Sequence, residues 1–156
     1  MSNVPLVYAP TGFNYVKEVT FRDISAASTT KVIDLFQIPA DGLVAKVGYY
    51  IAPGQFFDGG ATSTMTVQVG VTGTDTDYFV AASVVHVDGT EISSAINTGA
   101  AFNDATTANT INFVAYDAAS TSMISALFTA TGGNTDVLTQ GKIVFFAEVV
   151  NFSGIK

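Results

Sequence analysis

Short segments in which apolar and polar residues alternate recur along the chain, and this period of two is typical of β-strands with one buried face. The clearest segment is 64–71, where methionine and valines alternate with threonine, glutamine and glycine. Similar or mostly apolar segments occupy 16–24, 31–38, 43–51, 78–87, 111–115, 122–130 and 142–150. The two alanines in 78–87 also permit a helix at its start. No segment of ten or more residues has the helical period, so the pattern predicts about eight strands.

Turn-forming residues separate these segments. Pro39 fixes its own φ and Gly42 tolerates a positive φ, which predicts a tight turn between 31–38 and 43–51. After that turn, alternation places one set of side chains on a common face: Leu43, Ala45, Val47, Tyr49 and Ile51. The last segment, 142–150, is apolar on both faces, which predicts a strand that is central in its sheet or covered on its second face. The polar region 88–108 is long for a loop, so it is either a loop with a function or contains a short helix or strand that the pattern does not reveal.

This arrangement predicts an all-β fold with one core. Eight strands at this spacing are typical of an antiparallel β-sandwich, and a jelly roll, whose two sheets pack face to face, is the preferred architecture. An immunoglobulin-like sandwich is the alternative, although such domains often bury a tryptophan and this chain has none. A chain of 156 residues suits a single domain, which we place at 16–156.

The first fifteen residues differ from the rest, because prolines at positions 5 and 10 favour an extended path among apolar side chains. Such a segment is too apolar for a disordered tail. It either packs along its own domain or forms an N-terminal arm, 1–15, that lies on a neighbouring subunit. The residues that would bind the partner are Val4, Leu6, Val7, Tyr8, Phe13 and Tyr15.

Composition narrows the classes of function. Charged residues make up only 12% of the chain and the net charge is −7, with no lysine or arginine between Lys46 and Lys142. Nucleic-acid binding relies on clustered basic side chains, so we expect no nucleic acid as a partner. The absence of cysteine excludes thiolate catalysis and sulfur-ligated zinc. We expect no signal peptide and no membrane span, and therefore synthesis in a cytoplasm.

No set of residues indicates catalysis, and we expect that the protein is not an enzyme. His86, the single histidine, lies in an apolar segment and is interpreted as a partly buried histidine with satisfied hydrogen bonds. Glu18, Asp34 and Glu148 would form a glycosidase pair only if they faced one cleft, and alternation favours outward-pointing positions instead.

Asp75 and Asp77 are the best candidates for a metal site. Carboxylates two residues apart in a loop rich in glycine and threonine can offer oxygens to one Ca²⁺. The EF-hand pattern is absent, and aspartates in turns usually bond to their own backbone. The expectation is therefore no cofactor, with calcium at Asp75 and Asp77 as the alternative.

Three stretches resemble small structural proteins of tailed bacteriophages, particularly head decoration, or cement, proteins. They are VIDLFQIPADGLVAKVGYYI, TMTVQVGVTGTDTDYFVAA and LTQGKIVFFAEVV, which together cover about half of the chain. The resemblance implies a β-sandwich or jelly-roll protein of the virion, assembled in the host cytoplasm. It also implies a homotrimer whose partner is the major capsid protein and whose contacts stabilise the shell.

Two other functions remain open. The chain could be another virion component, such as a tail, fibre or knob adaptor, since the same pattern occurs in such proteins. A carbohydrate-binding β-sandwich module is the alternative from a different class, with Tyr49, Tyr50, Tyr78 and Phe79 as its aromatic candidates.

Overall fold

The computed structural model describes residues 14–40, 42–92 and 122–151, and this part of the chain is built almost entirely from β-strands. It contains one short 3₁₀ helix, η3 (Thr135–Val137). The strands are β1 (Tyr15–Thr20), β2 (Thr30–Ile38), β3 (Gly42–Tyr50), β4 (Thr64–Val71), β5 (Asp75–Val87), β6 (Ser122–Thr131) and β7 (Lys142–Asn151).

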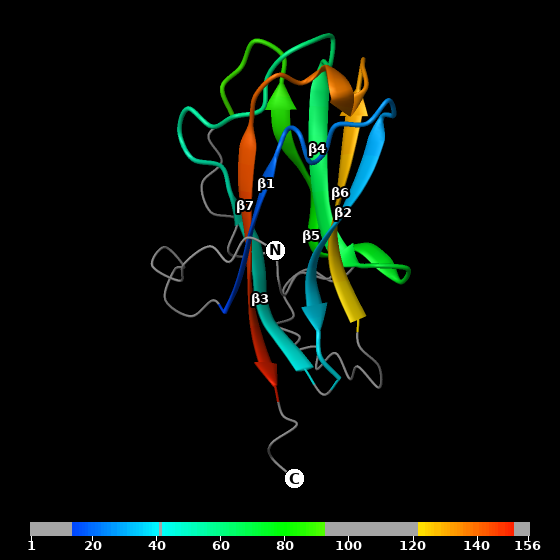
Figure 1. Cartoon of the computed structure of the whole chain (residues 1–156), viewed down its shortest axis with the longest axis vertical. Coiled ribbons are helices and arrows are strands. Elements are labelled where there is room, and N and C mark those ends of the chain that lie inside the picture. Colours follow the sequence, from blue (N-terminus) through cyan, green and yellow to red (C-terminus); the bar gives the residue numbers. More distant parts are fainter. Residues whose placement is uncertain (1–13, 41, 93–121, 152–156) are drawn as a thin grey trace.

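The strands form two antiparallel sheets that pack face to face (Figure 1). The smaller sheet has the order β1-β7-β3 and the larger has the order β2-β6-β4-β5. The chain crosses between the sheets at every connection from β1 to β4 and again from β6 to β7, whereas β4 and β5 form a hairpin within one sheet. The predicted all-β sandwich is confirmed, with seven strands in the described residues.

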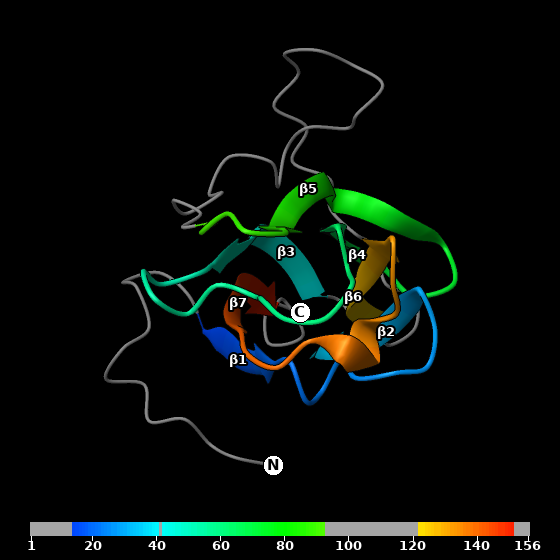
Figure 2. The ribbon, with the colours of Figure 1, turned by 90° about the horizontal axis from the view of Figure 1, so that it is seen from above.

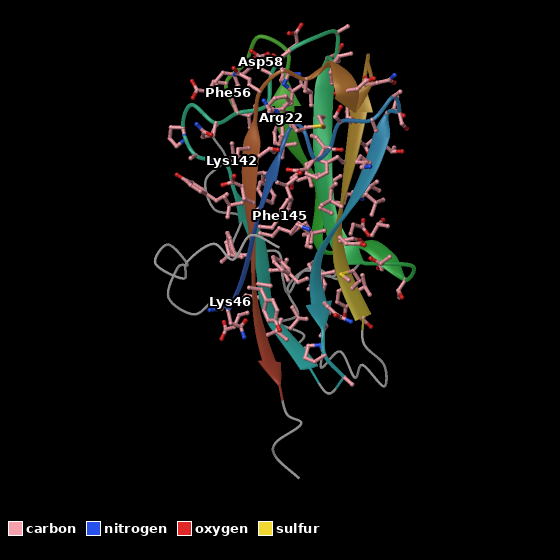
Figure 3. All side chains as sticks on the ribbon, in the orientation of Figure 1. Arg22, Lys46, Phe56, Asp58, Lys142 and Phe145 are labelled. Carbon is pink, nitrogen blue, oxygen red and sulfur yellow. The ribbon has the colours of Figure 1, made fainter. Side chains whose placement is uncertain are left out.

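The core lies between the two sheets and follows the predicted alternation. On β4 the buried side chains are Met65, Val67, Val69 and Val71, and each is at most 2% exposed. Aromatic rings continue the packing across the sandwich. Phe128 of β6 meets Phe145 of β7 edge to face at 6.2 Å between ring centroids, and the labelled Phe145 lies between the sheets in Figure 3. Such edge-to-face pairs add to the stabilisation from burial alone.

Three strands depart from the predicted boundaries or faces. β1 ends at Thr20, because the Asp23 carboxylate accepts hydrogen bonds from the Thr20 backbone N–H and hydroxyl, both at 2.7 Å. In β3 a bulge between Val44 and Lys46 breaks the single face predicted for 43–51, so that Val44 is buried as well as Val47. β5 begins at Asp75 and is a strand throughout, so the helix permitted at its start does not form.

The last strand, β7, is central in its sheet, as its two apolar faces predicted. Ile143, Phe145 and Ala147 point into the core and are fully buried. Phe146 points to the opposite side, opposite Val16 and Gly48, yet only 3% of it is exposed. Both predictions for this strand are therefore confirmed: it is central and its second face is covered at Phe146.

Loops at one end of the sandwich, the upper end in Figure 1, are bonded to each other. The Thr62 hydroxyl donates to the carbonyl of Asn134 at 2.9 Å, and the Thr139 N–H donates to the carbonyl of Asp58 at 2.9 Å. Gly141 lies so close to Phe57 that an added Cβ would be 2.3 Å from the ring. The connections before β4 and before β7 therefore form one packed unit.

Several predictions lie outside the described residues. They include the strand predicted at 111–115 and most of the region 88–108. Within the part of the chain that the structure describes, no helix is long and apolar enough to cross a membrane.

Candidate protein-binding surface

The outer face of the larger sheet is broad and nearly free of charge. Residues opposite each other in the strand register share a face, and the buried side of β4 identifies the inner one. The outer face, as the term is used below, comprises Thr30, Val32, Asp34, Gln37, Thr64, Thr66, Gln68, Gly70, Val84, Val87, Met123, Ser125, Leu127, Thr129 and Thr131. Asp34 is the one charged residue in this set.

Exposed apolar side chains concentrate on this outer face. Three large apolar residues are exposed in the described part of the chain, and two of them belong to it: Val32 at 51% and Val84 at 47%. Val32 lies on edge strand β2 opposite Leu127, whereas Val84 lies on edge strand β5 opposite Thr66. Between them the surface consists of threonine, glutamine and leucine. Such a surface offers methyl groups and short hydroxyls with little side-chain entropy to lose on contact.

The β4–β5 hairpin overhangs one corner of the outer face. Gly70 points outward from β4, and a Cβ added there would meet the carbonyl oxygen of Asp75 at 2.0 Å and the backbone nitrogen of Asp77 at 2.8 Å. The start of β5 therefore lies directly over Gly70. Figures 1 and 2 both show the hairpin swinging outward beyond β6. Sequence reasoning missed this overhang, because glycine at an outward position of a strand was its only signal.

The overhang carries the predicted calcium ligands. Asp75 Oδ1 accepts a hydrogen bond from the Asp77 backbone N–H at 3.2 Å, which is the local bonding expected of an aspartate in a turn. The pKa of the Asp77 carboxyl is raised, first because it shares a hydrogen bond with the Asp75 carboxyl, and then by partial burial and by the charge of Asp75. The described residues contain no group of three or more His, Cys, Asp or Glu side chains arranged to hold a metal. Calcium at this pair stays a prediction.

The smaller sheet presents a different surface, with ion pairs toward both ends. Lys46 and Glu148 lie 3.6 Å apart, and Lys142 and Glu18 lie 3.2 Å apart. In Figure 3 Lys142 lies near the upper end of this sheet and Lys46 lies farther down it. Glu18 and Glu148 therefore point outward as predicted, and Asp34 points outward from the other sheet.

A groove of about 370 Å³ runs between the edge strands β1 and β2 and contains several charged groups. Three of these groups bond within the protein. Glu18 pairs with Lys142, Asp23 accepts from Thr20, and the Lys17 ammonium donates to the backbone carbonyl of Asp34. The Lys17 contact occupies an edge carbonyl of β2, which protects that edge against pairing with another strand.

His86 is on the inner face of β5, opposite Met65, and 1% of it is exposed. Its ring nitrogens contact two backbone carbonyls, Nδ1 at 2.7 Å from that of Phe57 and Nε2 at 2.8 Å from that of Thr62. Both ring nitrogens therefore have hydrogen-bond partners, as predicted, but the side chain is fully buried rather than partly buried. No carboxylate among the described residues forms an ion pair with it.

The predicted partner-binding residues are mostly outside the described part of the chain. Tyr15 is the exception, and it is a strand residue of β1 whose ring meets Phe36 edge to face at 5.8 Å. Val4, Leu6, Val7, Tyr8 and Phe13 lie outside the described residues.

Of the aromatic residues considered for carbohydrate binding, Tyr49 and Phe79 are buried in the core and Tyr78 is half-buried against it. Tyr50 is exposed at 37%. Most of these rings therefore pack in or against the core.

Comparisons with known proteins identify no relative. A scan against protein-family models gave no match, and searches of curated proteins and of solved structures gave none either.

Proposed function

We propose that the protein is a structural component of a tailed-bacteriophage virion that decorates the outer surface of the head. In this proposal the outer face of the larger sheet binds the major capsid protein and so stabilises the shell. The observation that carries the proposal is that outer face, which is charge-poor, rich in threonine and exposes Val32 and Val84. The three stretches that resemble phage structural proteins supply the identity of the partner.

The chemistry of the outer face suits a protein partner. The cores of protein interfaces are depleted in lysine, glutamate and aspartate, and Asp34 is the one such residue in the set. Threonine methyl groups and the side chains of Val32, Val84 and Leu127 supply apolar contact, while the hydroxyls accept and donate hydrogen bonds at the rim. A nucleic acid would instead require clustered cations.

The size of the outer face indicates how attachment could reach useful affinity. Four strands spaced about 4.8 Å apart, each contributing about eight residues with a rise of about 3.3 Å, cover roughly 500 Å². A standard interface buries about 800 Å² of accessible surface on each partner, so one such face is about the size of a single modest interface. A homotrimer would present three faces at once, and the linked contacts would bind a repeating shell far more tightly than one.

A binding assay with charge insertions tests the proposal. The double variant Val32→Lys/Val84→Lys places two ammonium groups on the outer face at exposed positions, so the fold should persist in circular dichroism. Tyr50→Lys is the matched control, because Tyr50 is 37% exposed on the smaller sheet. Each protein is mixed with phage heads that lack the chain and sedimented.

We expect wild type and Tyr50→Lys to co-sediment with the heads and the double variant to lose at least tenfold in affinity. Equal binding by all three proteins would contradict the assignment of the outer face. Failure of the wild type to bind heads would contradict decoration itself, and cryo-electron microscopy of the virion would then distinguish a tail, fibre or knob component by its position.

A further inference from the structure

Asn14 ends β1 through its side chain. Its Nδ2 donates to the Val149 carbonyl at 2.6 Å, and its Oδ1 accepts from the Val149 N–H at 2.8 Å. The amide of asparagine offers the same kinds of donor and acceptor as a peptide group, so it can replace a backbone residue in the bonds between strands. The Asn14 backbone bonds to the same strand, because its N–H donates to the Ala147 carbonyl at 3.1 Å.

The strand register shows that β1 stops short of the end of β7. The pairing of β1 with β7 ends at Tyr15, opposite Ala147, whereas β3 pairs with β7 as far as Asn151. If β1 continued in the same register, the chain before Asn14 would meet Val149. The N–H and the carbonyl of Val149 already bond to the Asn14 side chain. That side chain therefore determines where β1 ends.

We propose that Asn14 is a positioning residue: it keeps residues 1–13 off their own sheet, so that this segment binds a second copy of the chain. Residues 1–13 are mostly apolar and carry no charged side chain, so exposing them to water is unfavourable. An extended segment of this length reaches about 43 Å, whereas the ten residues of β7 span about 33 Å. The segment is therefore long enough to cross a neighbouring sandwich.

A second copy is the partner that the proposed homotrimer supplies. The inference therefore rests on the self-association in the proposed function and not on the binding of heads. β1 is an edge strand of the smaller sheet (Figure 1). The chain leaves that sheet at its border, where a neighbour can approach. Because residues 1–13 add no charged side chain, they also bring no repulsion to a chain whose net charge is −7.

The variant Asn14→Val tests this role. Valine favours strands and its side chain forms no hydrogen bonds, so the backbone groups of Val149 become available to residues 1–13 of the same chain. The sheet of that chain then competes with the neighbour for the segment. Thr30→Val is the matched control, because it also places valine at an exposed strand end. Circular dichroism verifies the fold of both variants.

Sedimentation equilibrium measures the association of each protein. We expect the concentration at which half of the chains associate to be about tenfold higher for Asn14→Val than for wild type, and unchanged for Thr30→Val. Equal association of Asn14→Val and wild type would overturn the proposal. A wild-type monomer would overturn it together with the homotrimer, while co-sedimentation with heads would still test decoration separately.

Hydrogen exchange of the Val149 amide provides a second measurement, which follows the segment itself. In wild type this amide donates to Asn14 Oδ1. In Asn14→Val we expect residues 1–13 to take over that bond, so the amide should stay protected. The Phe145 amide in the middle of β7 is the internal reference. If Val149 exchanged about tenfold faster or more in Asn14→Val while Phe145 was unchanged, the segment would not compete for β7, and the proposal would be overturned.

Discussion

At the scale of single residues, Gly141 shows how little room the packed connections leave. Its φ is 129°, a region that side chains rarely adopt, and an added Cβ would lie 2.3 Å from the Phe57 ring. We expect Gly141→Ala to reduce the free energy of unfolding by about 3 kcal/mol, in the upper range for single substitutions. Urea denaturation measures this loss.

Gly73 provides the control for this substitution. Its φ is also positive, at 78°, but nothing lies within 4 Å of an added Cβ. Gly73→Ala should therefore reduce the free energy of unfolding only through its strained backbone conformation, by about 1 kcal/mol. Equal losses in the two variants would show that contact with Phe57 contributes nothing at Gly141.

Asp23 gives a second prediction at this scale. Hydrogen bonds from the Thr20 N–H and hydroxyl lower the pKa of the Asp23 carboxyl. A lowered pKa stabilises the fold above the pKa of an unfolded aspartate, about 3.9, and the contribution is lost as pH falls through the lower folded value.

Because Asp23 is exposed, we expect Asp23→Ala to reduce the free energy of unfolding by less than about 1 kcal/mol at pH 7. Near pH 2 the variant and wild type should unfold at the same denaturant concentration. A difference that persisted in acid would show that the carboxylate charge is not responsible.

At the scale of elements, the β4–β5 hairpin makes the clearest prediction. Asp75 raises the pKa of Asp77, so the associated stability is present below the pKa of an unfolded aspartate and is lost as pH rises through the folded value. Asp75→Asn removes the shared proton and the repelling charge. NMR titration of the Asp77 carboxyl carbon should then show a lower midpoint than in wild type, and an unchanged midpoint would contradict this coupling.

The same hairpin tests the calcium prediction. A bound Ca²⁺ would place a positive charge beside both carboxylates and would therefore lower the titration midpoint of Asp77. Calorimetric titration of wild type with CaCl₂ measures binding directly. No heat and no thermal shift would contradict calcium at this pair.

The elements also show which features the sequence could predict. β4 was predicted at 64–71 and spans Thr64–Val71, because clean alternation reports a strand with one buried face. The end of β1 depends on the Asp23 side chain, and the bulge in β3 depends on the partner strand, so local periodicity misses both. Alternation therefore predicts strands and their buried faces, but not where a strand ends or where a bulge interrupts it.

The local sequence pattern also could not predict which residues come together on the outer face. Alternation identified Thr64, Thr66 and Gln68 as the polar side of one strand. It could not place Val32 opposite Leu127, because that pairing joins segments about a hundred residues apart. The overhanging hairpin has the same origin, since it depends on backbone contact between Gly70 and the start of β5.

At the scale of the whole molecule, the homotrimer is the prediction to test first. We expect sedimentation equilibrium at micromolar concentrations to give three times the chain mass of 16.2 kDa. Deletion of residues 1–13 tests the arm, which should shift the protein toward monomer or weaken its binding to heads. A deletion that changed neither property would contradict the arm, and a wild-type monomer would contradict the trimer.

The glycines at the tips of the upper connections have a practical consequence. Gly54 and Gly89 both have positive φ and open space around an added Cβ. They lie near the bonded connections, because the Asp88 N–H donates to the Ser63 carbonyl and the Gly54 N–H donates to the Glu91 carboxylate. Exposed tips of this kind tolerate inserted sequence. A foreign epitope grafted at Gly89 would be displayed along the long axis of the sandwich, with the face that carries Val32 and Val84 left clear, so the protein could serve as a scaffold for presenting antigens.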